Sequence, residues 1–122
     1  MGRVILIVED DPRNLKLIRD LLQIRGYATL EATDGKQGVD MARAKMPDLI
    51  LMDIQMPVMD GFEATSILKA DTVTKSITIV ALTAFAMQGD RDKCMEAGFN
   101  DYITKPLDIR AFMTKIKEYL EK

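Results

Sequence analysis

Five short apolar runs alternate strictly with five longer amphipathic segments along this 122-residue chain. Short apolar runs are typical of strands buried in a parallel sheet, and amphipathic segments are typical of helices that cover it. The expected strands are residues 4–8, 28–32, 49–52, 78–82 and 102–104, and the expected helices are residues 12–25, 36–44, 62–69, 87–97 and 109–120. Strict strand–helix alternation predicts a parallel sheet with helices on both faces. With no repeat or linker-like stretch, we expect one α/β domain over residues 1–122.

The composition excludes several classes of function. The chain contains no histidine, which rules out Ser–His and Cys–His catalysis and any histidine metal ligand. Its 17 basic and 19 acidic residues give a net charge of −2, which disfavours nucleic-acid binding. A single cysteine excludes an internal disulfide, and no apolar run is long enough for a membrane span. We therefore expect a cytoplasmic protein that binds neither nucleic acid nor membrane.

Chemically useful side chains follow four of the five expected strands. Glu9 and Asp10 follow the first strand, and Asp53 follows the third. Thr83 follows the fourth strand and Lys105 the fifth. Ligands of open parallel sheets bind beyond the carboxyl ends of the strands, so these residues belong to one site. Clustered carboxylates favour a hard cation such as Mg²⁺, a lysine suits a phosphoryl group, and an aspartate can form an aspartyl phosphate.

Four motifs, in order, make the chain resemble the receiver domain of two-component response regulators. The motifs are LIVEDD at 6–11, LILMDIQMP at 49–57 with Asp60-Gly61, ALTA at 81–84 and YITKP at 102–106. The resemblance extends from Ile5 to about Leu120, nearly the whole chain. It implies a flavodoxin-like, doubly wound (βα)5 sandwich with strand order 2-1-3-4-5. Without a further domain, the chain is similar to stand-alone receivers of the DivK or CheY kind.

The resemblance also implies a phosphoacceptor and its metal. Asp53 would accept a phosphoryl group from a phosphohistidine of a histidine kinase or phosphotransfer protein. Asp10, Asp53 and the backbone carbonyl of Gln55 would bind Mg²⁺, with Mn²⁺ as a possible substitute, and Glu9 would hold a metal-bound water. The chain would thus be a signalling protein that takes part in its own phosphotransfer and autodephosphorylation, and not an enzyme for outside substrates.

Further roles follow from the same resemblance. Lys105 and Thr83 would bind the phosphoryl oxygens, and Tyr102 would be the switch aromatic that moves inward when Thr83 shifts. The fourth helix, fifth strand and fifth helix would contact a downstream protein. In the first helix, apolar residues sweep an arc of about 180°, which indicates either deep packing or a docking rim. The residues expected to contact the phosphodonor are Asn14, Leu17, Pro106 and Leu107.

Two rival functions are rejected from the residues and two remain open. A haloacid-dehalogenase-like phosphatase needs a second Asp two residues after its nucleophile, where Gln55 cannot supply a proton. A flavodoxin-like cofactor binder needs a phosphate cradle after the first strand, where consecutive acidic residues would repel a phosphate. The open alternatives are a receiver that binds partners without phosphorylation and a receiver excised from a hybrid histidine kinase.

Some residues are better explained by structure alone. Asp11 before Pro12 is typical of a helix N-cap with proline at the first helical position. Cys94 is expected to be a small, buried or half-buried residue of the fourth helix. Most of the nine methionines should fill the core. Met56 and Met59, in the loop after Asp53, are the methionines expected to be exposed.

Overall fold

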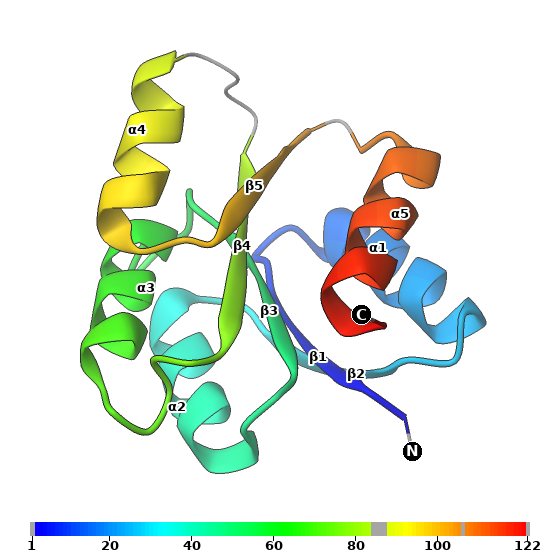
Figure 1. The fold of residues 1–122 in the computed structure, drawn as a ribbon, viewed down its shortest axis with the longest axis horizontal. Helices are drawn as coiled ribbons and strands as arrows, with labels where there is room; N and C mark the ends of the chain where they lie inside the picture. The colour runs from blue at the N-terminus through cyan, green and yellow to red at the C-terminus, as the bar shows by residue number, and fades with distance from the viewer. Residues whose placement is uncertain (1, 84–87, 106, 122) are drawn as a thin grey trace.

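A parallel sheet runs through the middle of the molecule, with helices packed on both of its faces (Figure 1). The computed structural model describes residues 2–83, 88–105 and 107–121, with the main chain alone at 88–90. The strands are β1 (Val4–Val8), β2 (Ala28–Ala32), β3 (Leu49–Asp53), β4 (Thr78–Thr83) and β5 (Asp101–Thr104). The helices are α1 (Pro12–Ile24), α2 (Gly35–Lys45), α3 (Gly61–Ala70), α4 (Gln88–Ala97) and α5 (Ile109–Leu120). The strand order is β2-β1-β3-β4-β5, which confirms the expected fold.

β3 and β4 end one residue later than the sequence pattern predicts, and β5 begins one residue earlier, at Asp101. Asp53 ends β3 because it still pairs with Leu82 of β4, and Thr83 ends β4 because it pairs with Thr104 of β5. Hydrogen bonds to a neighbouring strand, and not the apolar pattern, therefore set these two ends. Both polar side chains are consequently held by the sheet itself and not by a loop. The expected start of the fourth helix, residue 87, lies outside the described residues.

The side chains of the inner strands pack alternately into two separate hydrophobic cores, one on each face of the sheet. In β3, Ile50 and Met52 pack with α2, α3 and α4, whereas Leu49 and Leu51 pack with α1 and α5. All four are fully buried, as expected for a strand covered on both faces. Each such side chain contributes roughly 1.5–3 kcal/mol of transfer free energy, so the centre of the sheet is a main source of the stability of the fold. Figure 1 shows the two helical layers on either side.

Aspartate N-caps set where four helices begin. Asp11 accepts a hydrogen bond from the backbone N–H of Arg13, which confirms the expected cap of α1. The caps of α2, α3 and α5 are Asp34, Asp60 and Asp108, each accepting from a backbone N–H in the first helical turn. A cap of this type is worth about 1 kcal/mol. These caps anchor the helix starts at the edge of the sheet where the polar strand ends gather.

The expected exposure of Met56 and Met59 is wrong. Both are half-buried and pack against the core shared by α2, α3 and α4. The loop is drawn inward because the backbone N–H of Gly35 donates to the carbonyl oxygen of Met59 at 3.1 Å. Met46 and Met95 are the exposed methionines among the described side chains. Cys94 is buried as expected, and no described helix has the length and apolar character to cross a bilayer.

Candidate functional site

Three carboxylates gather beyond the ends of β1 and β3. Glu9, Asp10 and Asp53 each offer an oxygen, and these oxygens all lie within 4.8 Å of one another. The two strands are neighbours in register, with Val8 beside Met52, so the residues that come next along each chain segment, Glu9 and Asp53, lie side by side. Glu9 is further held by its backbone N–H, which donates to the carbonyl oxygen of Ala32 at 3.0 Å. The sheet therefore builds the acidic cluster that the sequence predicts.

Lys105 reaches into this cluster from the end of β5. Its Nζ donates to Oε1 of Glu9 at 2.9 Å and to Oδ2 of Asp53 at 3.1 Å. Its backbone N–H donates to the carbonyl oxygen of Thr83, which ties the residue to β4. Burial opposes the charged form, but the two carboxylates outweigh it and raise the pKa of Lys105. The ammonium is therefore kept charged where it can contact an anionic ligand.

The environment of Glu9 disfavours the charged form of its carboxyl group. Its side chain is 0% exposed, and burial together with its hydrogen bond to Asp53 raises its pKa to about 7, against the opposing effect of Lys105. When all three carboxylates are ionised, their negative charge exceeds the positive charge of the single ammonium by two. Oxygen ligands with this excess charge match a hard divalent cation such as Mg²⁺. The cluster thus fits the metal that the sequence analysis expects.

Both oxygens of Asp53 are oriented by donors. Oδ1 accepts from the backbone N–H of Gln55 at 3.0 Å, and Oδ2 accepts from Lys105. The side chain is nearly buried, yet it lines an open hollow of about 270 Å³. The lining residues are Glu9, Asp10, Asp11, Asn14, Asp53, Ile54, Gln55 and Lys105. A carboxylate fixed in this way is accessible from one direction only, at the mouth of the hollow.

Gly61 and Asp11 support the site in ways that the sequence analysis did not assign. A Cβ on Gly61 would lie 2.4 Å from the backbone oxygen of Asp53, so only glycine lets α3 approach the end of β3. The backbone N–H of Asp11 donates to Oε2 of Glu9 at 3.3 Å. The Asp-Gly pair at 60–61 is the sequence signal for the first contact. No signal in the sequence indicates the second.

The two expected switch residues lie on adjacent strands. Thr83 is buried at the end of β4, one strand away from Asp53. Tyr102 is half-buried on β5, is paired in register with Ala81, and packs against the core under α2, α3 and α4. The tyrosine therefore lies two residues below the strand end that carries Thr83. It borders a second hollow, of about 430 Å³, between α4 and α5.

The expected phosphodonor contacts are only partly gathered at the site. Asn14 lines the acidic hollow, and Leu17 on α1 is 43% exposed. Leu107 is half-buried and packs against the core under α1 and α5. Pro106 lies outside the described residues. Because Leu17 and Ile24 both face solvent, the wide apolar arc of α1 does not reflect deep packing.

Comparisons with known proteins agree on one family. A model of the response regulator receiver domain matches residues 5–117. The polar-differentiation response regulator DivK of Brucella anthropi is 44% identical over 120 residues, which cover 98% of each chain. The receiver domain of a sensor histidine kinase from Pseudomonas aeruginosa, solved with magnesium coordinated in its active site cleft, is 38% identical with a TM-score of 0.92 over 100% of each chain.

A complex from Saccharomyces cerevisiae adds a partner to the comparison. It contains a histidine phosphotransfer protein bound to the receiver domain of its downstream response regulator. The match is 31% identical, with a TM-score of 0.89, and covers 97% of this chain and 88% of that one.

Proposed function

Because this chain belongs to the response regulator receiver family, we propose that Asp53 accepts a phosphoryl group from the phosphohistidine of a histidine kinase or histidine phosphotransfer protein. The observation that carries the proposal is the placement of Asp53, whose two oxygens are oriented by Gln55 and Lys105 at the floor of an open acidic hollow. The proposed unit is one receiver domain over residues 1–122. The proposed location is the cytoplasm.

The proposed reaction is a single displacement at phosphorus. An oxygen of Asp53 attacks the phosphorus, the bond to the donor imidazole nitrogen breaks, and its electron pair stays on that nitrogen. Positioning and charge neutralisation dominate such transfers, and this chain supplies both through fixed donors. Lys105 would bind the incoming phosphoryl oxygens, with the Thr83 hydroxyl as a second donor. Later attack by water would return the aspartate, which is the proposed autodephosphorylation.

The acidic cluster is the proposed magnesium site. Asp10, Asp53 and the backbone carbonyl of Gln55 would hold Mg²⁺, or Mn²⁺ in its place, and Glu9 would hold a metal-bound water. When bound, the ion supplies positive charge between the carboxylates and the phosphoryl oxygens. Support comes from the 4.8 Å grouping of the carboxylate oxygens and their two uncompensated charges. The related Pseudomonas aeruginosa receiver, solved with magnesium in its cleft, adds a precedent.

The proposed output surface is formed by α4, β5 and α5. Phosphorylation adds about −1.5 to −2 charge beside Asp53, which is enough to bias a two-state element such as Thr83 with Tyr102. The hollow of about 430 Å³ beside Tyr102 supports this assignment, because it is lined by Arg91 of α4 and Lys115 of α5. A downstream protein would bind there.

The phosphodonor is proposed to dock where α1 borders the acidic hollow. Asn14 lines the hollow and Leu17 is exposed on the same helix, and the half-buried Leu107 lies in the segment between β5 and α5. Pro106 belongs to the same proposal from its sequence position alone. The yeast phosphotransfer complex shows that a related receiver binds such a donor.

Intact mass after incubation with acetyl phosphate and Mg²⁺ tests the proposal. We expect one phosphoryl adduct on the protein, which is lost in the Asp53→Asn variant and in the presence of EDTA. Asp40→Asn, on an exposed turn of α2, is the matched control and should keep the adduct. An adduct that survives Asp53→Asn contradicts the assignment of the acceptor. No adduct on the wild-type protein, from acetyl phosphate or from a phosphorylated donor protein, favours the interaction-only receiver.

A further inference from the structure

Three basic side chains that form no ion pair with another described side chain surround a hollow beside α5. Arg25 at the end of α1 and Arg110 and Lys117 of α5 line a space of about 450 Å³. Among the described side chains, none of these three forms an ion pair, whereas Lys115 on the same helix pairs with Asp101 at 3.0 Å. An excess of positive charge is thus concentrated here on a chain whose net charge is −2.

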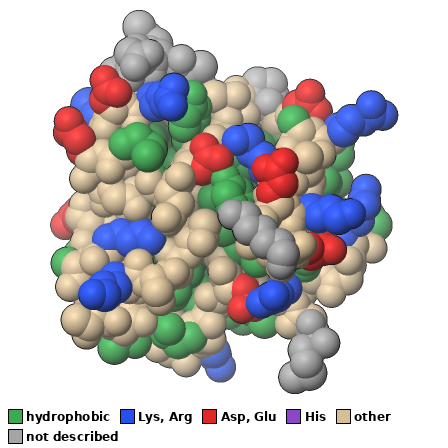
Figure 2. Space-filling view, in the orientation of Figure 1, with side chains coloured by type: hydrophobic (Ala, Val, Ile, Leu, Met, Phe, Trp, Pro, Cys, Tyr) green, Lys and Arg blue, Asp and Glu red, His purple; other side chains and the backbone are tan. Residues whose placement is uncertain are grey.

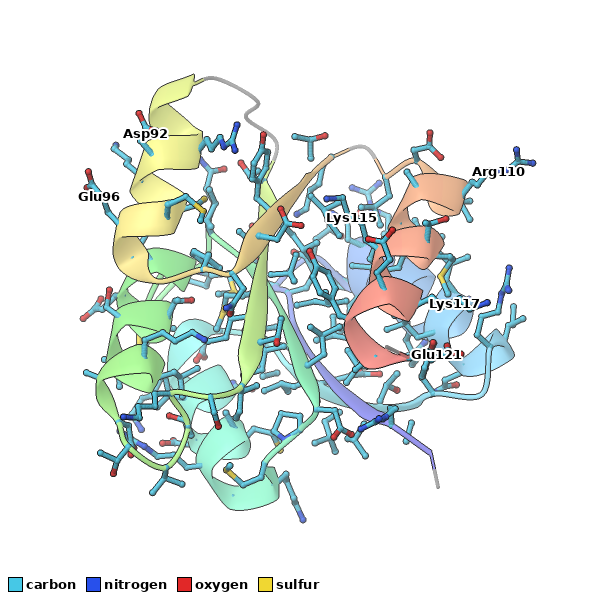
Figure 3. All side chains as sticks on the ribbon, viewed as in Figure 1. Asp92, Glu96, Arg110, Lys115, Lys117 and Glu121 are labelled. Carbon is cyan, nitrogen blue, oxygen red and sulfur yellow. The ribbon has the colours of Figure 1, made fainter. Side chains whose placement is uncertain are left out.

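The geometry of α5 separates the paired lysine from the unpaired cations. Figure 3 shows Arg110 and Lys117 on the side of the helix turned away from β5, and Lys115 on the side toward it. Basic side chains gather along the same edge of the molecule in Figure 2. Arg110 and Lys117 are seven residues apart, about 10 Å along the helix axis. The two cations therefore project from one flank of α5, two turns apart.

Apolar surface lies between and beside these cations. Ile109 and Met113 line the same hollow, and Ile109 is 51% exposed. Ile24, next to Arg25, is 79% exposed. A smaller hollow of about 220 Å³ shares Arg25, Met113 and Lys117 and continues toward Tyr27 and Glu121, whose carboxylate accepts a hydrogen bond from the Tyr27 hydroxyl and forms no ion pair among the described side chains. We call the surface lined by Arg25, Ile109, Arg110, Met113 and Lys117 the α1–α5 groove.

We propose that the α1–α5 groove docks an acidic, amphipathic helix of a partner protein. Charge complementarity carries the choice of partner, because unpaired cations beside exposed apolar side chains match carboxylates that flank an apolar stripe. A partner helix running along α5 would place acidic residues two turns apart, opposite Arg110 and Lys117. None of the groove residues lines the hollow around Asp53, so the groove is a surface separate from the proposed phosphoacceptor site.

A second copy of this chain fits the groove less well. The outer face of α4 carries Asp92 and Glu96, which are exposed but only one turn apart (Figure 3). Two carboxylates one turn apart cannot pair with both Arg110 and Lys117, because those two cations are two turns apart. Self-association is therefore an outcome to be tested against the proposal.

Fluorescence anisotropy with a labelled synthetic peptide tests the groove. The probe is a helical peptide with glutamates two turns apart and leucines between them, and its control carries glutamine in place of glutamate. The test variant is the double reversal Arg110→Glu/Lys117→Glu. The matched control is Lys45→Glu/Lys75→Glu, which changes the net charge equally at exposed positions outside α1, α4 and α5. Acetyl phosphate labelling of each variant is measured in parallel.

We expect the glutamate peptide to bind the wild-type protein, and we expect this binding to weaken as salt is added. The Arg110→Glu/Lys117→Glu variant should raise Kd about tenfold or more, whereas the control variant changes it less than about twofold. Phosphorylation of Asp53 should be unchanged in both, so a failure of the groove is distinguishable from a failure of the proposed function. Equal loss in both variants, equal binding of the glutamine peptide, or no saturable binding would each overturn the proposal. Sedimentation equilibrium showing self-association that Arg110→Glu/Lys117→Glu abolishes would also overturn it, in favour of a second copy.

Discussion

Gly61 lies directly against the backbone of Asp53, and a Cβ added to Gly61 would come within 2.4 Å of the Asp53 carbonyl oxygen and 2.7 Å of the Cα of Ile54. Both atoms belong to the main chain at the end of β3, so neither can yield by changing a rotamer. The first residue of α3 therefore determines how closely the helix approaches the proposed phosphoacceptor.

Gly61→Ala should destabilise the protein although alanine is the better helix former. Helix propensity favours the change by about 1 kcal/mol, but overpacking against backbone costs about 1–3 kcal/mol and displaces Asp53. We expect a net loss of about 1–2 kcal/mol in urea unfolding and slower labelling by acetyl phosphate. Gly2→Ala, whose Cβ meets only one atom at 3.9 Å, is the matched control. Unchanged stability and labelling in Gly61→Ala would contradict the steric argument.

Thr65 and Thr74 are both fully buried but differ in hydrogen bonding. We therefore expect replacement by valine to change the stability of the protein in opposite directions at the two positions. Oγ1 of Thr65 has no hydrogen-bond partner among the described residues, whereas Oγ1 of Thr74 donates to the carbonyl of Leu68 at 2.7 Å. Thr65→Val removes a desolvated hydroxyl and should stabilise the protein by about 1 kcal/mol. Thr74→Val leaves the carbonyl of Leu68 with only the longer hydrogen bond from the backbone N–H of Asp71, at 3.4 Å, and should destabilise the protein by about 1 kcal/mol. Thermal unfolding of both variants measures the contrast, which two shifts of the same sign would refute.

The raised pKa of Glu9 predicts an unusual pH dependence of stability. Between 4.5, its unfolded value, and about 7, the folded protein binds more protons at Glu9 than the unfolded chain does. The free energy of unfolding should therefore fall as pH rises through this range, by at most about 3 kcal/mol, in metal-free buffer. Added Mg²⁺ should stabilise the protein more at pH 8 than at pH 5, because it favours the ionised cluster. Urea titrations with EDTA or Mg²⁺ measure this, and Glu9→Gln should flatten the metal-free profile.

The lowered pKa of Asp101 predicts that its contribution to stability depends on pH with the opposite sign. Burial would raise its pKa, but Tyr119, the backbone N–H of Tyr102 and Lys115 outweigh that effect and lower it. The stability that Asp101 contributes is present above its unfolded pKa of 3.8 and is lost as pH falls through the lower folded value. Asp101→Asn should cost about 1–2 kcal/mol at pH 7, and the difference from wild type should shrink below pH 4. Asp92→Asn, on the exposed face of α4, should change neither value in the same unfolding experiment.

The fold and the members of the candidate site could be predicted because both depend on local patterns. Apolar runs locate β1 and β3, and the polar residue after each run lies at the same edge of any parallel sheet. Asp53 and Thr83 were nonetheless placed beyond their strands, since pairing with a neighbouring strand is not visible in a hydropathy pattern. Asp11 was recognised as a helix cap, but its contact with Glu9 depends on how the β1–α1 turn closes.

Exposure was the least predictable property. Met56 and Met59 were expected to face solvent because they lie in a loop, yet a hydrogen bond to Gly35 draws that loop onto α2. The hydropathy pattern predicts a wide apolar arc on α1. The pattern alone does not distinguish the buried side chain of Leu22 from the exposed side chain of Ile24. Both distinctions depend on which neighbouring element covers the residue, and that is decided by tertiary packing.

The hydrogen bond between Lys105 and Glu9 joins residues 96 positions apart in the sequence. A growing polypeptide that has left the ribosome only as far as β4 already carries the acidic residues of the cluster. It still lacks Lys105, whose ammonium contacts two of them. The phosphoacceptor pocket is thus among the last features to be completed during synthesis. A prematurely terminated product that lacks β5 and Lys105 would carry the acidic residues without the cation that orients Oδ2 of Asp53.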